Sequence, residues 1–327
     1  MNSETKSKRF ISFSSLMQAE TVGPANCHST SHLLSACSCT YLVTSWGQKG
    51  RTTAGWREMA DTNVTFQHVP PPFTFEKDFD GPEFHLWFSN VWKSGYVLAA
   101  AYVVLVWAGR WYMEERPAYN MRSALAIWSA CLSVFSIMGA LRLNAVWLHD
   151  FRERGLTHSL CDGHSLTAPI SGFWAVAFSL SKAVEFGDTF FIVARKQKLI
   201  FLHWYHHALT LVAVWYQYVN KTGPALFFMC MNFSVHALMY PYYTLRASRV
   251  RVPKSVAMVI TTLQVLQMIT GLAVIFYVYG VVKSGRDCDW SDESFYMMFV
   301  VYGSFAVLFL NFFMKSYLSK PVRDKKE

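Results

Sequence analysis

Charged side chains are scarce in this sequence. Of its 327 residues, 16% are Asp, Glu, Lys or Arg and 53% are hydrophobic, whereas about a quarter of an ordinary soluble domain is charged. Basic residues outnumber acidic ones, 30 to 21, but they lie in short gaps between long apolar runs and not on one domain, which argues against a nucleic-acid partner. The composition therefore excludes an ordinary soluble domain and indicates an integral membrane protein.

Seven stretches of 18 or more residues carry few or no charges. They cover residues 95–112, 123–141, 166–194, 199–219, 223–245, 255–282 and 294–314. Each can cross the roughly 30 Å hydrocarbon core of a bilayer as a helix. The expected fold class is therefore all-α, a polytopic membrane protein with about seven transmembrane helices.

The Lys and Arg residues of the gaps predict the orientation. The gaps 113–122, 195–198, 246–254 and 315–327 hold 14 of them, against 8 in the alternate gaps, and the more basic side faces the cytosol. The C-terminus is then cytosolic and the N-terminus lumenal. Asn63, in an Asn-Val-Thr acceptor sequence, is glycosylated only if it lies on that lumenal side.

The cysteines and the two ends of the chain complete the predicted organisation. Cys161 and Cys288 fall in gaps assigned to the lumen, where an oxidising compartment allows either a disulfide or two free thiols. Residues 1–69 are expected to be a disordered extension, since the first sixty lack an apolar rhythm and a signal-peptide core, and Met59 offers an alternative start. Residues 70–318 are the predicted membrane domain, and residues 319–327 a basic cytosolic tail.

Three of the eleven histidines, His203, His206 and His207, lie within five residues near the cytosolic end of the fourth run. These positions share one face of a helix, and a histidine in a membrane span is costly unless it is satisfied. One interpretation is a metal site like the dimetal centres of membrane desaturases and hydroxylases, although those have several histidine boxes and this chain adds only His236. The other is a nucleophile, because an acyl-imidazole is an activated acyl donor when water is excluded.

The third run carries Lys182, Glu185 and Asp188, which recur every three residues along one helix face. Ionisable groups at membrane depth usually face a cavity or one another, so this face is expected to point inward. The two carboxylates either hold the imidazoles in one tautomer, or form a structural ion network with the lysine. The sequence leaves both interpretations open.

The fifth and sixth runs add amides and a fourth histidine. Asn232 and His236 lie one helical turn apart, which suits the amide to donate a hydrogen bond to a developing oxyanion. Gln264 and Gln267 are again at helical spacing, and they either line a cavity or make hydrogen bonds between helices.

Together, these motifs resemble the very-long-chain fatty acid elongase family, the condensing enzymes of microsomal chain elongation. The resemblance covers about residues 70–320, including the two lumenal cysteines. Four family motifs match in order on successive spans: Lys182-x-x-Glu185-x-x-Asp188-Thr189, His203-x-x-His206-His207, Asn232-x-x-x-His236-x-x-Met239-Tyr240-x-Tyr242-Tyr243 and Thr261-x-x-Gln264-x-x-Gln267. Residues 195–207 resemble the branch that elongates long saturated and monounsaturated chains of palmitate type.

The resemblance implies six helices around a substrate tunnel, with the first helix packed outside. It implies a 3-oxoacyl-CoA synthase, an acyltransferase that condenses a long-chain acyl-CoA with malonyl-CoA. The reaction releases CO2 and CoA and yields a 3-oxoacyl-CoA two carbons longer. By resemblance, His206 takes the acyl group covalently and His203, His207 and His236 assist. No metal and no cofactor is expected beside the two CoA substrates.

The other candidate site residues fall into two groups. Residues expected to support the chemistry or an oxyanion are Lys182, Glu185, Asp188, Asn232, Gln264 and Gln267. Residues expected at a cytosolic mouth, where basic groups suit CoA phosphates, are Arg195, Lys198, Tyr240, Tyr243 and Arg246.

The resemblance places the chain in the endoplasmic reticulum membrane as a multi-pass protein. There it would contact membrane lipid and work with the 3-oxoacyl-CoA reductase, the dehydratase and the enoyl-CoA reductase of the elongation cycle; homo- or hetero-oligomerisation stays open. On the residues alone, two other classes also stay open: a metal-dependent membrane desaturase or hydroxylase, and a non-enzymatic seven-helix transporter or receptor.

Overall fold

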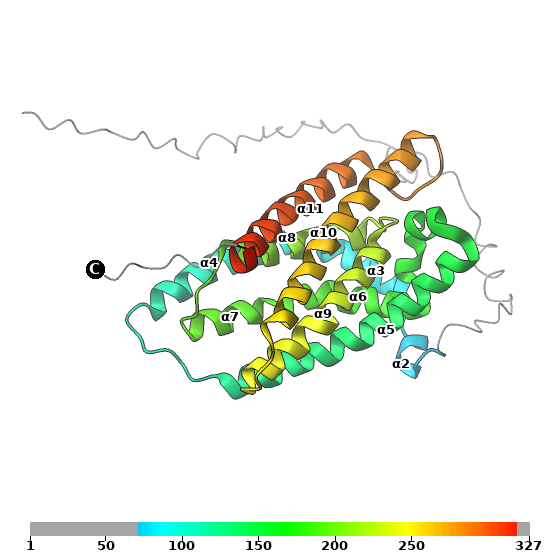
Figure 1. The fold of residues 1–327 in the computed structure, drawn as a ribbon. Coiled ribbons are helices and arrows are strands. Elements are labelled where there is room, and N and C mark those ends of the chain that lie inside the picture. The colour runs from blue at the N-terminus through cyan, green and yellow to red at the C-terminus, as the bar shows by residue number, and fades with distance from the viewer. Residues whose placement is uncertain (1–70, 319–327) are drawn as a thin grey trace, which may run out of the picture. The chain divides into compact units, whose positions relative to one another are not determined.

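The computed structural model describes residues 71–318, in which helices joined by short connections make up the fold and no strand occurs (Figure 1). The helices are α2 (Thr74–Lys77), α3 (Gly81–Val91), α4 (Ser94–Met113), α5 (Arg122–Cys161), α6 (Pro169–Val184), α7 (Phe186–Ala194), α8 (Phe201–Val219), α9 (Ala225–Ala247), α10 (Lys254–Lys283) and α11 (Asp292–Phe313). The all-α prediction is confirmed. The predictions for Met59, Asn63, the extension 1–69 and the tail 319–327 lie outside the described residues.

Each of the seven predicted runs coincides with a helix or a pair of helices. By length and composition, α4, α5, α10 and α11 with its continuation to Leu318 are able to cross a membrane. The runs that fall short are those of α6–α7, α8 and α9, which carry the predicted polar motifs. The helices α6 and α7 are 16 and 9 residues long and fall short in length. The imidazoles and amides of α8 and α9 lower the hydropathy of those two helices.

The prediction of a loop directly after the second run is wrong. The helix α5 does not end at residue 141 but continues to Cys161, with a break only at Gly155, whose φ of 83° and ψ of 172° suit glycine. The charged residues of this stretch make it unsuitable for the hydrocarbon core of a membrane, but they do not prevent it from forming a helix. Asp150 and Arg154 pair one turn apart on it.

The third run is likewise not one continuous helix. It ends at Val184 and begins again at Phe186, with Glu185 at the junction. Gly187 follows at once, and the ring of Trp128 on α5 lies where a Cβ would project. The break therefore separates Lys182 on α6 from Asp188 on α7.

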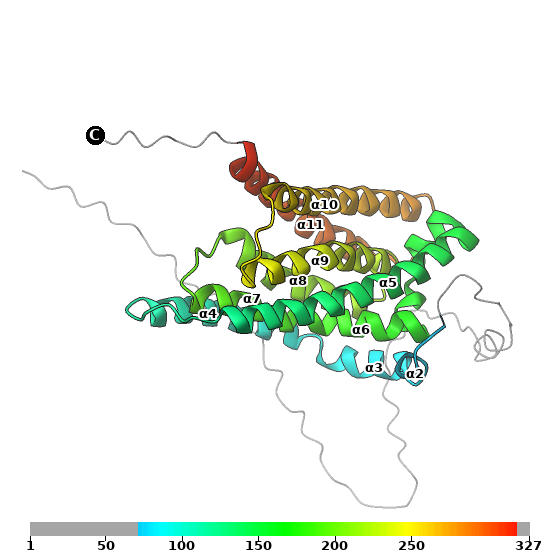
Figure 2. The same ribbon diagram turned by 60° about the horizontal axis from the view of Figure 1, so that its bottom comes forward.

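Six segments close a ring around a central space. Around this ring α5 contacts α9, α9 contacts α10, α10 contacts α11, α11 contacts α8, α8 contacts α6, and α6 contacts α5. Figures 1 and 2 show these helices side by side, with α7 continuing the line of α6. The helix α4 packs outside the ring against α7 and α8. The arrangement implied by the resemblance, six helices enclosing a space and the first outside, is therefore confirmed.

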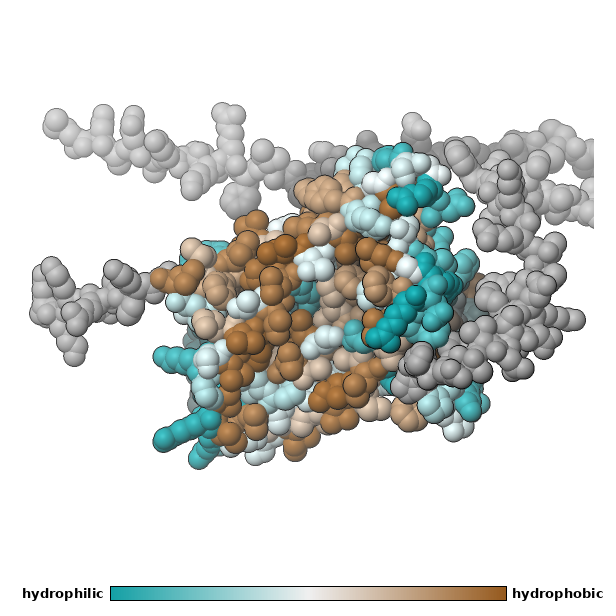
Figure 3. Space-filling model, turned by 45° about the vertical axis from the view of Figure 1, so that its right-hand side comes forward, coloured by the Kyte–Doolittle hydropathy of each residue, from teal (hydrophilic) through white to brown (hydrophobic). Residues whose placement is uncertain are grey.

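The outer surface carries large apolar side chains. Figure 3 shows them across the middle of one face, with hydrophilic residues toward its edges. Val97 and Leu105 on α4, and Val300 and Val307 on α11, are each more than half exposed. Apolar surface on this scale is stable only against another apolar phase. The chain is therefore a multi-pass membrane protein.

One end of the ring is tied by a disulfide between Cys161 and Cys288, which joins the end of α5 to the α10–α11 connection. The amide of Asp289 donates to the carbonyl of Cys161 over 3.0 Å, and the amide of Gly223 donates to the carbonyl of Asp289 over 2.7 Å. Three connections thus meet at this end, called here the disulfide end. The other, called the basic end, holds the α7–α8 and α9–α10 connections.

A buried ion pair fixes the segment ahead of α3. Glu76 is 0% exposed, and its carboxylate accepts from Nε and Nη2 of Arg142 on α5, at 2.9 and 2.5 Å, and from Nε1 of Trp174 on α6, at 2.6 Å. Burial raises the pKa of Glu76, but the hydrogen bonds from Arg142, Trp174 and the Phe73 amide outweigh it and hold this pKa below its ordinary value. The carboxylate is therefore charged at neutral pH and ties α2 to α5 and α6.

Gly139 allows α5 and α9 to approach closely, which generates a test of the ring. A Cβ at this position would lie 2.5 Å from ring carbons of Phe233, which is only 2% exposed. We expect Gly139→Ala to destabilise the fold by about 1–3 kcal/mol through overpacking. The thermal unfolding midpoint of the purified variant in detergent measures this.

Gly303→Ala on α11 is the matched control. There the added methyl group meets nothing within 4 Å, and alanine is the better helix former by up to ~1 kcal/mol, so its midpoint should stay or rise. Equal midpoints for the two variants would contradict the close α5–α9 contact.

Candidate functional site

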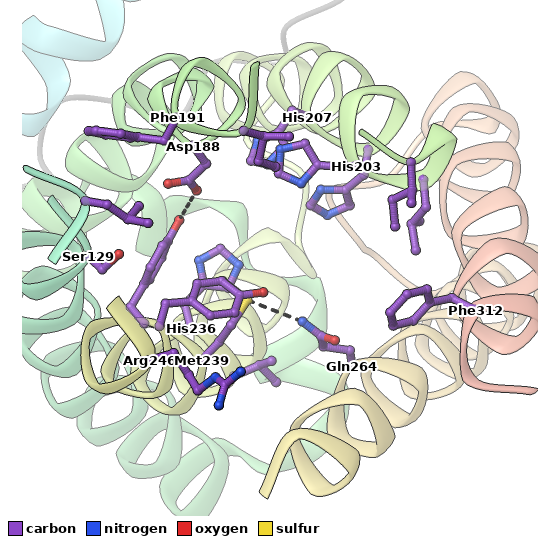
Figure 4. A pocket seen from close by; sticks show the side chains of 18 of the residues that line it. Ser129, Asp188, Phe191, His203, His207, His236, Met239, Arg246, Gln264 and Phe312 are labelled. Atoms are coloured by element: carbon purple, nitrogen blue, oxygen red, sulfur yellow. Dashed lines mark hydrogen bonds between the residues drawn. The ribbon is translucent and has the colours of Figure 1, made fainter. Parts of the chain in front are cut away.

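The ring encloses a cavity of about 520 Å³, lined by side chains from α5, α7, α8, α9, α10 and α11 (Figure 4). It brings together most of the residues predicted from the sequence. Those that line it are Asp188, Arg195, His203, His206, His207, Asn232, His236, Tyr240, Tyr243, Arg246, Gln264 and Gln267. Of the other predicted residues, Lys182 and Glu185 are buried beside it, and Lys198 is exposed on the α7–α8 connection.

The imidazoles of α8 form one compact group. The helix begins at Phe201, so all three histidines fall in its first two turns. The ring centroids of His203 and His207 are 4.6 Å apart, and those of His206 and His207 5.4 Å. His206 also lies 4.8 Å from the ring of Phe305 on α11, which places it on the side of α8 that faces the cavity.

Lys182 is the centre of a buried network that crosses from α6 to α9. Its Nζ donates to Oε1 of Glu185 over 2.7 Å and to Oδ1 of Asn232 over 3.0 Å. Because the carbonyl oxygen of Asn232 is held by the lysine, its amide nitrogen faces His236, whose Nε2 is 3.4 Å away. The lysine therefore neutralises a carboxylate and orients an amide at the same time.

Glu185 lies 4.0 Å from Nδ1 of His236, which is too long for a hydrogen bond. Of the two interpretations left open by the sequence, this arrangement favours the ion network for Glu185.

Asp188 belongs to a second network. Its carboxylate accepts from Nε1 of Trp128 over 2.7 Å and from the hydroxyl of Tyr240 over 3.0 Å, the bond drawn in Figure 4. The break at Glu185 turns Asp188 toward α5 and α9 and away from Lys182. The three charged residues of this motif therefore do not form one set, and the hydroxyl of Tyr240 is engaged within the protein.

Three arginines stand around the cavity at the basic end. Arg195 follows the last turn of α7, Arg246 lies near the end of α9, and Arg122 begins α5. Arg122 was not predicted, and Lys198, which was, does not line the cavity. Guanidinium groups bind phosphates in bidentate fashion, so this end is suited to a phosphate-bearing molecule.

A smaller cavity of about 50 Å³ leads from the histidines toward the disulfide end. It shares His206, Asn232, Gln267 and Met268 with the larger cavity. Its lining on α8 is His206, Thr210, Ala213, Val214 and Gln217, a spacing that marks one stripe of a helix. His206 is thus the one α8 residue at the junction of the two cavities.

Two residues linked to the imidazole group by hydrogen bonds were missed by sequence reasoning. Oγ1 of Thr189 lies 3.0 Å from Nε2 of His203, and the hydroxyl of Tyr102 on α4 lies 2.7 Å from the same Oγ1. Thr189 ends the first of the four motifs, whose spacing alone assigns it no role. Tyr102 lies in an apolar run with no spacing signal, so the sequence offered no means to find it.

The metal interpretation has no matching arrangement in residues 71–318. No group of three His, Cys, Asp or Glu side chains in that range is placed to hold one ion. The fold and site define a class: a polytopic membrane protein whose polar groups surround an internal cavity with a basic mouth.

Within this class the chain belongs to the ELO family, the GNS1/SUR4 family, whose sequence model matches residues 87–325. It is 42% identical over 255 residues to very long chain fatty acid elongase 6 of Mus musculus, across 78% of this chain and 96% of that protein. With very long chain fatty acid elongase 6 of Drosophila melanogaster the identity is 40% over 250 residues, 76% and 79% of the two chains.

With very long chain fatty acid elongase 3 of Homo sapiens the identity is 38% over 265 residues, across 81% of this chain and 95% of that protein. The resemblance inferred from the four motifs is confirmed. The protein is a fatty acid elongase, an enzyme of fatty acid elongation.

The Lys182–Glu185 pair generates a test of the buried network. Lys182→Met leaves a carboxylate buried without its cation, and we expect it to destabilise the fold by about 3–5 kcal/mol. The double variant Lys182→Met/Glu185→Gln removes both charges and should recover most of that loss. Thermal unfolding in detergent compares the two.

The exposed pair Lys283–Asp292, 3.0 Å apart, provides the control. Lys283→Met should leave the unfolding midpoint close to that of the wild-type protein, because solvent screens such pairs. A double variant as unstable as Lys182→Met alone would show that the two buried charges do not depend on each other.

Proposed function

We propose that the protein is a 3-oxoacyl-CoA synthase that condenses a long-chain acyl-CoA with malonyl-CoA through an acyl-imidazole on His206. The observation that carries this proposal is the position of His206 between a wide cavity with a basic mouth and a narrow cavity lined mainly by apolar groups. A thioester held with its CoA in the first and its tail in the second has its carbonyl carbon at His206.

In the first half-reaction, a ring nitrogen of His206 attacks the thioester carbonyl. The carbon–sulfur bond breaks, and CoA leaves as a thiol with the proton that the imidazole gives up. A nitrogen–acyl bond replaces the thioester. Such an intermediate survives only where water is kept out, and a site enclosed by helices within a membrane provides that exclusion.

In the second half-reaction, malonyl-CoA loses CO2 and the released electron pair forms an enolate. The enolate carbon attacks the acyl carbon, the nitrogen–acyl bond breaks, and the electron pair returns to His206, which takes up a proton. The product is a 3-oxoacyl-CoA two carbons longer. This chemistry needs positioning and stabilisation of negative charge more than it needs a metal or another cofactor, and we propose none.

The surrounding residues have matching roles in this proposal. The Asn232 amide, oriented by Lys182, donates to the oxyanion, and His203, His207 and His236 assist proton transfer. Gln264 and Gln267 position the substrate, while Glu185 and Asp188 act only through their neighbours.

At the mouth, Arg195 and Arg246 bind CoA phosphates together with Arg122, which was not predicted. Tyr240 and Tyr243 border the same opening. Lys198 is left out because it lies outside the cavity lining.

We also propose that the chain lies in the endoplasmic reticulum membrane with the basic end in the cytosol and the disulfide end in the lumen. The excess of Lys and Arg and the position of the disulfide support this orientation independently. The N-terminus is then lumenal, which would allow glycosylation at Asn63. A 3-oxo product requires a reductase, a dehydratase and an enoyl reductase next.

His206→Ala tests the proposal directly. With palmitoyl-CoA and labelled malonyl-CoA, we expect the wild-type protein to form a 3-oxoacyl product. The variant should lose at least about 10³-fold in kcat, as expected for a removed nucleophile. Incubation with acyl-CoA alone should add the acyl mass to the wild-type protein and not to the variant.

His158→Ala, at a partly exposed histidine of the disulfide end, is the control and should keep full activity. Full turnover by His206→Ala would contradict the acyl-imidazole mechanism. Activity that required bound iron, oxygen and a reductant would favour the desaturase class instead.

The narrow cavity generates a second prediction, on chain length. From His206 to Gln217 the stripe on α8 rises about 16 Å. This corresponds to roughly thirteen methylenes, given a carbon–carbon bond of about 1.5 Å at tetrahedral angles. A space of about 50 Å³ holds only part of such a chain. The flexible side chains of Met229, Met268 and Met298 that line it must therefore move aside.

Two substitutions on the stripe should shift the chain-length limit in opposite directions. Ala213→Phe fills the narrow cavity, and we expect the longest accepted acyl chain to shorten by about four carbons. Gln217→Ala shortens the side chain at the end of the stripe and should admit about two carbons more. Competition among saturated acyl-CoAs of different length measures both limits, and unchanged limits would contradict this placement of the tail.

A further inference from the structure

The helix α4 lies outside the ring, yet one of its side chains is linked to the imidazole group through a residue of α7. Tyr102 is 6% exposed, and its ring stacks on Phe186 with centroids 4.0 Å apart. Its hydroxyl is 2.7 Å from Oγ1 of Thr189, which is itself 1% exposed and lies 3.0 Å from Nε2 of His203. Three polar groups from α4, α7 and α8 thus form one continuous chain.

The direction of this chain follows from its hydrogen count. In the part of the protein that is described, the hydroxyl of Tyr102 has one hydrogen-bond partner, Thr189. If Thr189 donated to Tyr102, the phenolic hydrogen would be buried without an acceptor, which is unfavourable. Tyr102 therefore donates to Thr189, whose single hydrogen is then directed at Nε2 of His203.

An Nε2 atom that accepts a hydrogen bond has no hydrogen of its own. The neutral ring of His203 then carries its proton on Nδ1, because the two tautomers differ in which nitrogen is protonated. With the opposite direction, Nε2 would be the donor and Nδ1 would be bare. The tautomer of His203 thus depends on the hydroxyl of a residue on another helix.

We propose that Tyr102 is a positioning residue that holds His203 as the Nδ1–H tautomer through Thr189. This rests on the proposed function, in which His203 assists the acyl transfer. A ring fixed in this form offers one defined donor, Nδ1–H, to the charge that develops on the oxyanion or the departing sulfur. Without the Tyr102 hydroxyl, Thr189 is free to donate or accept, and His203 divides between two forms.

The hydroxyl, and not the packing of the ring, is the part that matters in this proposal. Phenylalanine at position 102 keeps the stacked contact with Phe186 and removes one buried polar group. We therefore expect Tyr102→Phe to fold with an unfolding midpoint at or above that of the wild-type protein. Loss of activity in this variant is then separated from loss of structure.

The kinetic test compares four variants in the acyl-CoA and malonyl-CoA assay. Tyr102→Phe and Thr189→Val should each lower kcat about 10–100-fold, the range for groups that orient a functional histidine. KM for both substrates should stay within about twofold, because the effect arises in the reaction step. Thr189→Ser retains the hydroxyl and should restore most of kcat.

Tyr218→Phe is the matched control, since the buried hydroxyl of Tyr218 has no hydrogen-bond partner in the described part of the chain. It should leave kcat and KM unchanged. A Tyr102→Phe variant with the wild-type kcat would overturn the proposal, as would a Thr189→Ser variant as slow as Thr189→Val.

The spectroscopic test needs no turnover. In ¹⁵N spectra of histidine-labelled protein, the His203 signals are assigned by their absence in His203→Asn. We expect a single Nδ1–H tautomer in the wild-type protein and a mixture in Tyr102→Phe. A single Nε2–H tautomer in the wild-type protein would refute the proposed direction. If no condensation product forms at all, the proposed function is wrong. The spectrum still tests whether Tyr102 sets the tautomer of His203 through Thr189.

Discussion

Lys182 and Glu185 place opposite charges inside the ring of helices, away from water. Because an isolated ion in such surroundings is strongly unfavourable, each charge requires the other, and they meet over 2.7 Å. The same ammonium group holds the carbonyl oxygen of Asn232 over 3.0 Å, so the ion pair also fixes α6 against α9. The orientation of the Asn232 amide beside His236 follows from that constraint. The Asn232–His236 part of the cavity lining therefore depends on one lysine.

The rest of the cavity is lined by side chains of a different chemical kind. Beyond His206 the lining is mainly aliphatic, aromatic and rich in methionine, and such side chains pack without fixed directions. Hydrogen bonds and charges demand one geometry, whereas thioethers adapt to the shape that occupies them. The protein thus combines a rigid region at the histidines with an adaptable region behind them.

The sequence was sufficient where a repeating pattern carries the information. Hydrophobic runs located every spanning helix, and polar residues at helical spacing located most of the cavity lining. It was insufficient for the end of α5, because charge predicts where hydrocarbon ends and not where a helix ends. It also failed for Tyr102 and Trp128, each one of several aromatic residues in an apolar run, because their partners depend on how helices distant in sequence pack. Arg122 and Lys198 are equally basic in sequence, and only packing distinguishes the one that lines the cavity.

The mouth at the basic end is bordered by one set of guanidinium groups, Arg122, Arg195 and Arg246. In the proposed reaction both substrates carry a CoA group, so they compete for these three arginines and cannot bind them at the same time. The first CoA must dissociate before malonyl-CoA binds. Between these two steps the acyl group remains bound covalently to His206. Two substrates that share one CoA-binding opening should therefore show substituted-enzyme kinetics, with parallel lines in double-reciprocal plots.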